Sequence, residues 1–181
     1  GTVTGIDSIG GLVGKQDGNI SNSYASGAVN GTEDVGGLVG NQSGNVTESY
    51  ATGTVNGTDY VGGLVGKQDG NISSSSASGF VNGSNRVGGL VGRQDSGIIN
   101  TSEASGTVDG ITNVGGLVGV QQGEIRASNA SGIINASENY AGGLVGQTSG
   151  NITGSYATGN INGTSTVGGL AGSSSGNITN S

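Results

Sequence analysis

The hydrophobic positions of this chain return with a fixed period. The hexapeptide Val-Gly-Gly-Leu-Val-Gly at residues 35–40 recurs with small changes, and we call each copy the repeat box. The other copies occupy residues 9–14, 61–66, 87–92, 114–119, 141–146 and 167–172, so successive copies lie 26 or 27 residues apart. A fixed period of roughly 20 to 50 residues is typical of solenoids, in which every repeat forms one structural unit.

Three short blocks make up each repeat. In the first repeat they are the box, residues 19–24 and residues 25–30, and polar segments separate them. Short blocks rich in Val, Ile, Thr and Ser and bounded by Gly, Asn and Asp predict strands and turns. The many glycines oppose a helix by roughly 1 kcal/mol each relative to Ala. Propeller blades are the alternative, but they need roughly 40 to 50 residues per repeat.

The predicted fold is all-β, a parallel β-helix (β-solenoid) with three short strands per coil of 26–27 residues and about seven coils. A right-handed coil is expected because right-handed crossovers are the commoner outcome for parallel strands. Residues 1–181 are expected to form a single domain. Because the chain begins and ends within its own repeat, we expect it to be a segment of a larger exported protein.

Stacked coils would place equivalent residues about 4.8 Å apart, in columns. One aliphatic column per strand is expected to fill the core, with an Ala column and a Ser column at inward or corner positions. The aliphatic columns are Leu12, Leu38, Leu64, Leu90, Leu117, Leu144 and Leu170; Ile20, Val46, Ile72, Ile99, Ile125, Ile152 and Ile178; and Val29, Val55, Val81, Val108, Ile134 and Ile161. Buried Ser hydroxyls are expected to bond to each other or to the backbone along the axis.

Amide side chains also recur in columns, which begin at Asn19, Asn30 and Gln16. Stacked amides can bond up and down a parallel sheet, so we predict amide ladders. The Asn-Gly pairs, such as Asn30-Gly31, are expected at sharp turns where both residues tolerate positive φ. Two one-residue insertions, within residues 94–97 and 134–141, also predict turns. We interpret the many Asn-x-Ser/Thr sequons as a by-product of the Asn columns, with glycosylation as the alternative.

Composition narrows the possible functions. The net charge is −7, with five Lys and Arg against twelve Asp and Glu, which argues against a nucleic-acid-binding surface. Without Cys there can be no disulfide framework and no thiolate metal site. No apolar run is long enough to span a bilayer, so direct membrane insertion is not expected.

No catalytic chemistry is apparent in the sequence. Without His and Cys, neither a Ser-His-Asp triad nor a zinc-peptidase helix motif can be built. Carboxylates fall in expected turns, and Arg86, Arg93 and Arg126 occupy different offsets with no acidic cluster that they plainly meet. The calcium-binding nonapeptide motif is absent, and the column of Asp17, Asp69 and Asp95 is broken by Ser and Gln. We therefore predict no enzyme activity, no cofactor, and no catalytic or metal-binding residue.

The repeat resembles a known family. The box, followed by Gly-Asn-Ile-x-x-Ser-Tyr-Ala-x-Gly and then Val-Asn-Gly-Thr, is similar to the GLUG repeat over essentially all 181 residues. That family occurs in large exported and surface-attached proteins of bacteria and archaea, including adhesins similar to filamentous haemagglutinin and non-catalytic parts of IgA-cleaving metallopeptidases. The resemblance implies a β-helical stalk or adhesive segment and transfers no catalytic residue.

We therefore expect a structural or adhesive segment of a secreted or cell-surface protein, acting as a rigid stalk or extended binding rod. The expected partners are the chain itself, end to end or side by side as a homo-oligomer, or a host or cell-surface protein or glycan. Contacts are expected on two variable columns, Lys15/Asn41/Lys67/Arg93 and Tyr24/Tyr50/Ser76/Glu103.

Two other classes remain open. One is a carbohydrate-binding or carbohydrate-active β-helix. The other is an ice-binding solenoid, for which small polar ranks would form a flat face that thermal hysteresis would reveal. Those ranks are Ser26, Thr52, Ser78, Ser105, Ser131 and Thr158, beside Ala28, Thr54, Phe80, Thr107, Ile133 and Asn160.

Overall fold

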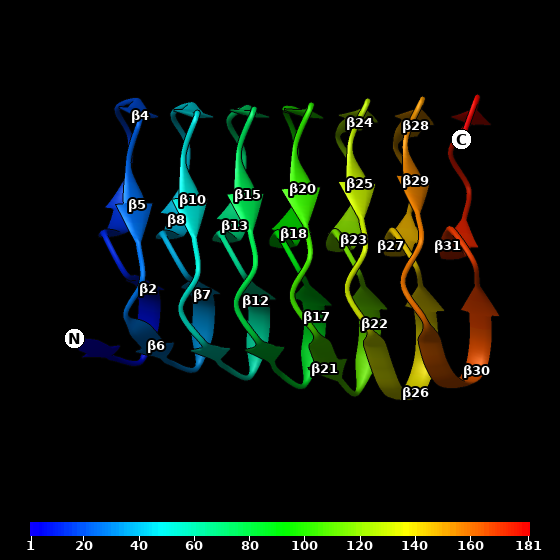
Figure 1. The fold of residues 1–181 in the computed structure, drawn as a ribbon, viewed down its shortest axis with the longest axis horizontal. Coiled ribbons are helices and arrows are strands. Elements are labelled where there is room, and N and C mark those ends of the chain that lie inside the picture. The colour runs from blue at the N-terminus through cyan, green and yellow to red at the C-terminus, as the bar shows by residue number, and fades with distance from the viewer.

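The computed structural model describes residues 1–181 as a stack of coils with no helix. About seven coils of some 26 residues stand side by side along the long axis, and the two termini lie at opposite ends (Figure 1). All pairing between strands is parallel, and each strand bonds to its equivalent one coil along. The predicted all-β solenoid is confirmed.

Each complete coil contains five strand segments. In the second coil the path runs through β7 (Glu33–Gly36), β8 (Val39–Gln42), β9 (Val46–Thr47), β10 (Tyr50–Ala51) and β11 (Val55–Asn56). The repeat box is divided between β7 and β8 by a bend, and the second expected block is divided by Glu48, at φ 49°. These internal bends turn the three blocks expected from the sequence into five strands.

Equivalent strands form four sheets. The twelve-stranded sheet contains two strips, which join where long strands span both. One strip is β1 (Thr2–Thr4), β6 (Ala28–Asn30), β11, β16 (Val81–Asn82) and β21 (Val108–Gly110); the other is β2 (Asp7–Gly10), β7, β12 (Asp59–Gly62), β17 (Asn85–Gly88) and β22 (Thr112–Gly115); the spanning strands are β26 (Ile134–Gly142) and β30 (Ile161–Gly168).

The remaining sheets follow the other sides of the coil. The first is β3 (Val13–Gln16), β8, β13 (Val65–Gln68), β18 (Val91–Gln94), β23 (Val118–Gln121), β27 (Val145–Thr148) and β31 (Ala171–Ser174). The second is β4 (Ile20–Ser21), β9, β14 (Ile72–Ser73), β19 (Ile98–Asn100), β24 (Glu124–Arg126), β28 (Asn151–Thr153) and β32 (Ile178–Thr179). The third is β5 (Tyr24–Ala25), β10, β15 (Ser76–Ala77), β20 (Glu103–Ala104), β25 (Asn129–Ala130) and β29 (Tyr156–Ala157).

The two insertions have different outcomes. The first lies in a turn, where Gly97 adopts φ 74°, as predicted. The second was predicted to be a turn but lies inside the continuous strand β26, whose register with β30 shifts between Ala136 and Asn139. A strand can absorb one extra residue as a bulge without leaving the sheet, so an insertion does not require a turn.

The interior contains two separate hydrophobic clusters. The larger has 21 buried residues, from the Leu, Ile/Val and Ala columns and the second Val of the box. The smaller has 12, mainly from the Val29 column and the first residue of the box. The three predicted aliphatic columns are therefore core, and the box supplies two more, at Val35 and Val39, that the sequence analysis had not assigned.

Glycines of the box lie where strands touch backbone to backbone. A Cβ atom at Gly62 would lie 1.9 Å from the carbonyl oxygen of Val65 and 2.7 Å from the amide nitrogen of Gly92. One at Gly66 would lie 2.5 Å from the amide nitrogen of Val35. Side chains cannot fit at these two box positions, the second and the sixth, and we call the contact between them the glycine waist.

The remaining box glycine explains the Ala column. A Cβ atom at Gly63 would lie 2.9 Å from the Cβ atom of Ala77 and 2.1 Å from the carbonyl oxygen of Gly89. Gly and Ala face each other in this way in the first six coils, where a larger side chain at either position would not fit.

Left-handed backbone is found at two other columns rather than at the Asn-Gly pairs. Asp34 (φ 49°), Tyr60 (φ 52°) and Arg86 (φ 54°) precede the box, and Glu48 (φ 49°) and Ser74 (φ 49°) mark the second bend. The Asn-Gly prediction was wrong because neither residue of Asn30-Gly31 adopts positive φ. Those pairs lie at a bend where glycine is required for packing.

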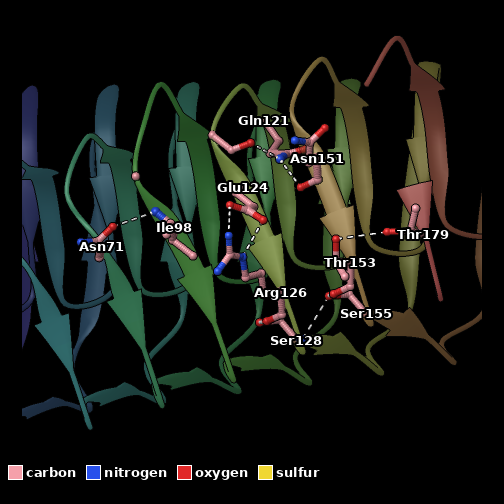
Figure 2. A network of polar contacts seen from close by, with 12 residues as sticks. Asn71, Ile98, Gln121, Glu124, Arg126, Ser128, Asn151, Thr153, Ser155 and Thr179 are labelled. Carbon is pink, nitrogen blue, oxygen red and sulfur yellow. Dashed lines mark hydrogen bonds and ion pairs between the residues drawn. The ribbon is translucent and has the colours of Figure 1, made fainter. Parts of the chain in front are cut away.

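The Ser column stabilises the second bend. The Ser75 hydroxyl donates to the carbonyl oxygen of Ser73 at 2.8 Å, across the left-handed residue between them, and accepts from the amide of Ser49 at 3.2 Å. Figure 2 shows the equivalent contact between Ser128 and Ser155. Bonding to the backbone, one of the two predicted arrangements, satisfies these buried hydroxyls.

Two of the amide columns bond to the backbone instead of forming ladders. Gln42 Nε2 donates to the carbonyl oxygens of Gly44 (2.6 Å) and Asn71 (3.0 Å), which closes the turn after β8. In the column that begins at Asn19, a side-chain oxygen accepts an amide from the next coil, as Asn71 does from Ile98 at 2.9 Å (Figure 2). The spacing of the coils allows either scheme, so the sequence could not distinguish them.

Candidate functional site

Charged side chains form four ion pairs, each between residues that are near in the chain or in neighbouring coils. No group of three or more carboxylate, His or Cys side chains is placed to hold a metal ion. No helix of the structure is long and apolar enough to cross a membrane. Of the turn carboxylates, Asp95 contacts Lys67 at 3.4 Å and Arg93 at 2.5 Å.

Each arginine meets an acidic partner, which corrects the sequence analysis. Arg86 binds both carboxylate oxygens of Asp59 at 2.8 Å. Arg126 contacts Glu124 at 2.5 Å within β24 (Figure 2). The first of these pairs could not be recognised in the sequence, because Asp59 and Arg86 are one coil apart in the chain but adjacent in space.

A half-buried cluster surrounds Tyr60 on the side of the box. The guanidinium carbon atoms of Arg86 and Arg93 lie 5.0 Å and 5.6 Å from the centre of its ring, within cation–π range. Since Asp59 and Asp95 neutralise both arginines, the cluster is a stabilising contact between coils. The variable column Lys15/Asn41/Lys67/Arg93 runs past this cluster, and its last two cations are already paired.

Asp34 is the one carboxyl with a clearly perturbed environment. Its side chain is 7% exposed, and its Oδ2 atom accepts a hydrogen bond from Asn41 Nδ2 at 2.7 Å. Burial raises its pKa above the ordinary value, with smaller contributions from the charges of Asp7 and Glu33. The bond from Asn41 and the charge of Lys67 lower it, but do not outweigh burial.

The second variable column starts with a stacked aromatic pair. The rings of Tyr24 and Tyr50 are 5.3 Å apart and inclined by 10°, and both side chains are exposed. Ser76 and Glu103 continue the column on the same sheet. Stacking along the axis leaves mainly ring edges facing solvent, so the pair is not a flat platform.

The small polar rank suggested for ice binding lies in a bend. Thr52 falls between β10 and β11, and Phe80 and Ile133 in the neighbouring rank are exposed. The two ranks therefore do not form one flat strand surface.

The larger of the two surface hollows lies along the bend between the two strips of the twelve-stranded sheet. Its volume is about 790 Å³, and five coils contribute to it. Three neighbouring columns and one aliphatic residue line it: Asn82, Asp109, Asn135 and Asn162; Gly57, Gly83, Gly110, Ala136 and Gly163; Ser84, Ile111, Ser137 and Thr164; and Ile161. We call this hollow the Asn groove.

Glycine makes the groove deep. A Cβ atom at Gly83 would lie 2.8 Å from Val61 Cγ2 and 2.9 Å from Val87 Cγ2, both in the smaller core cluster. The backbone can therefore approach the core closely here, and it forms the floor of the groove. The Asn column and the Ser/Thr column form its two walls.

An amide ladder follows one wall, as the sequence predicted for this column. Asn56 Nδ2 donates to Asn30 Oδ1 at 2.9 Å, and Asn162 donates to Asn135 at 2.8 Å. In each bond the amide donates to the residue one coil nearer the N-terminus.

The ladder is interrupted at Asn82, which is bonded neither to Asn56 nor to Asp109. Asp109 accepts from Asn135 Nδ2 at 2.7 Å, and it pairs in register with Asn82. As a carboxylate it has no proton to donate to Asn82, and the side chain of Asn82 makes no hydrogen bond in the structure. In the sequence, Asp109 is recognisable only as a gap in a column of Asn. That gap, beside a Gly column, was the available signal for the groove.

A comparison with protein families decides the family. The model of the GLUG motif matches residues 7–30, 31–56, 57–82, 83–109 and 137–162, which is more than half of the chain. The chain belongs to the GLUG family. Residues 110–136, although unmatched, form a GLUG-like coil with the same strands and register. The comparison with curated proteins gave no match, and neither did the comparison with solved structures.

Proposed function

We propose that this chain is a rigid structural segment of a secreted or cell-surface protein, acting as a stalk or an extended binding rod without catalytic activity. The supporting observation is the continuous register, in which every coil pairs with the next and shares its buried columns. A quasi-one-dimensional stack of this kind resists bending and presents its surface repeatedly along one axis.

The family supports the location. GLUG repeats occur in extracellular or surface proteins, and solenoids of this family are typically non-catalytic. The absence of His and Cys agrees with a non-catalytic role, because the commonest nucleophile–base pairs cannot form.

Location can be tested in the source organism with an antibody raised against residues 1–181. We expect the antibody to label intact cells or to detect the protein in the culture medium. A signal that appears only after lysis would contradict the proposed location.

Rigidity can be tested with fluorophores at Asp17→Cys and Ser175→Cys, both exposed turn residues in a chain that has no other Cys. These positions are six coils apart, which corresponds to about 29 Å at about 4.8 Å per coil. We expect one narrow distribution of energy-transfer efficiency. A broad distribution under native conditions would mean that the chain is not a rod.

A further inference from the structure

We propose that the Asn groove binds an extended, uncharged polysaccharide that runs parallel to the solenoid axis. This goes beyond the structural role and does not depend on it, because a rod with an empty groove would still be a rod.

The shape of the groove suits a chain-like ligand. It spans five coils, from Gly57 to Thr164, which corresponds to about 19 Å at about 4.8 Å per coil. Its volume of about 790 Å³ lies within the range of ordinary ligand sites, roughly 300 to 1,000 Å³. A compact metabolite would fill only part of this length.

The lining repeats the chemistry that recognises sugar hydroxyls. Four of the five coils offer an amide or carboxylate on one wall, and three offer a Ser or Thr on the other. Amides and hydroxyls both donate and accept, as sugar hydroxyl groups do. Ile111 at the middle coil, which is 39% exposed, and Ile161 near the C-terminal end provide aliphatic surface for the C–H faces of sugar rings.

The interruption of the ladder at Asn82, beside Asp109, supplies the strongest anchor. Elsewhere ladder bonds already occupy much of the hydrogen-bonding capacity of the wall. Here the amide of Asn82 is free, and the carboxylate of Asp109 has further acceptor sites. One ligand hydroxyl could accept from Asn82 and donate to Asp109, and a bond to a charged acceptor is stronger than a neutral one.

Charge and backbone pairing argue against other polymers. Asp109 is the only charged residue of the lining, and the chain has a net charge of −7, so polyanions such as nucleic acids and polyuronates are disfavoured. A peptide that adds as a strand needs a free sheet edge. The floor offers none, since the amide of Gly83 already donates to the carbonyl oxygen of Asp109 at 3.1 Å.

Two variants test the groove. Asp109→Asn gives residue 109 an amide that can donate to Asn82 Oδ1, and it removes the charged acceptor. Ser84→Phe places a ring in the groove. Glu33→Gln is the matched control, because it makes the same change in charge at an exposed residue outside the groove.

The probes are hexasaccharides of β-1,4-linked glucose, β-1,4-linked mannose and α-1,4-linked glucose, titrated calorimetrically at up to millimolar concentration, with hexagalacturonate as the charged comparison. We expect at least one neutral probe to bind and to shift the side-chain amide resonances of Asn82 and Asn135. Asp109→Asn should weaken binding about tenfold, the loss expected for one charge-assisted hydrogen bond. Ser84→Phe should abolish binding, and Glu33→Gln should leave it unchanged.

Failure of all neutral probes, tighter binding of hexagalacturonate, or equal affinity in the wild type and both groove variants would overturn the proposal. Circular dichroism of each variant shows whether it folds, and either groove variant alone is sufficient for the test. The fluorophore experiment on rigidity is independent, so an empty groove and a flexible rod would be recognised separately.

Discussion

At the residue scale, the fold depends on positions that exclude side chains. Gly62 and Gly66 allow neighbouring strands to touch at the waist, and Gly63 faces Ala77 across the larger core cluster. Gly83 allows the backbone to approach Val61 and Val87 in the smaller cluster. The high glycine content therefore reflects close backbone approach at specific positions rather than flexibility.

A first prediction concerns the waist. In Gly62→Ala the new Cβ atom would lie 1.9 Å from a backbone carbonyl oxygen that cannot move without breaking the sheet. We expect a loss of about 3 kcal/mol or more in the free energy of unfolding, measured with urea. Gly18→Ala is the control, since nothing lies within 4 Å of its added Cβ atom, and it should change stability by less than about 1 kcal/mol. Equal effects of the two substitutions would contradict the proposal that the glycine waist excludes side chains.

A second prediction follows from the raised pKa of Asp34. The folded state holds the proton to higher pH than the unfolded state, so stability should fall as pH rises above about 4 through the folded pKa. Asp34→Asn removes this titration, and Asn suits the left-handed backbone, as Asn113 (φ 54°) does in the equivalent position. The variant should be more stable than the wild type at pH 7. Urea midpoints between pH 4 and 7 check this; parallel curves for the two proteins would refute it.

At the scale of the element, most strands are only two to four residues long, and side-chain hydrogen bonds stabilise the bends at their ends. The bend after β9 is held by the Ser column, and the turn after β8 is held by the Gln column. These side chains bond to backbone groups that the short strands leave unpaired. The repetition of Ser in every coil, and of Gln in the first five, is therefore explained by the bends that flank the strands.

A third prediction tests the turn after β8. Gln42→Leu would fill the same space but leave the carbonyl oxygens of Gly44 and Asn71 without the amide donor, at a cost of about 1 to 3 kcal/mol. Gln42→Thr should recover part of this loss, because Thr148 in the equivalent position donates to the carbonyl oxygen of Gly150 at 3.1 Å. Thermal denaturation of the three proteins gives the order. If the Gln42→Leu variant were as stable as the wild type, the Gln42 side chain would not stabilise the turn.

At the scale of the whole molecule, each coil depends on its neighbours for burial. Leu90 is fully buried between coils, whereas Leu12 in the first coil is 48% exposed. Stability in such an array is approximately the sum of contributions from each coil and from each contact between neighbours. The same residue type should therefore contribute unequally to the free energy of unfolding in different coils.

A fourth prediction compares these two leucines. Leu90→Ala should cost about 2 to 5 kcal/mol, the range for a buried leucine. Leu12→Ala should cost clearly less, because much of its side chain stays in contact with water. Hydrogen exchange measured by mass spectrometry should show faster exchange around residue 90 in the first variant and only near the first coil in the second. Equal losses would mean that the array unfolds without regard to local burial.

The candidate site was only partly predictable. The column of Asn30 and its equivalents, including the gap at Asp109, was visible in the sequence. It forms the amide ladder that was expected, apart from the interruption at Asn82. The groove was not predicted, because its depth depends on Gly83 packing against Val61 and Val87 in the core. Ion pairs such as Arg86 with Asp59 were missed for the same reason: the partners are close only after the coils stack.

The sequence by itself determined the period, the all-β solenoid and the register of its columns. A slip of one residue would turn the aliphatic residues to the other face, so seven repeats of one pattern admit a single alignment. Only the tertiary structure decided that each coil bends into five strands, that the core is divided in two, and that a groove follows the Asn column. Those features depend on distances between backbones of different strands, such as Gly62 against Gly92, and the pattern along the chain carries no record of such distances.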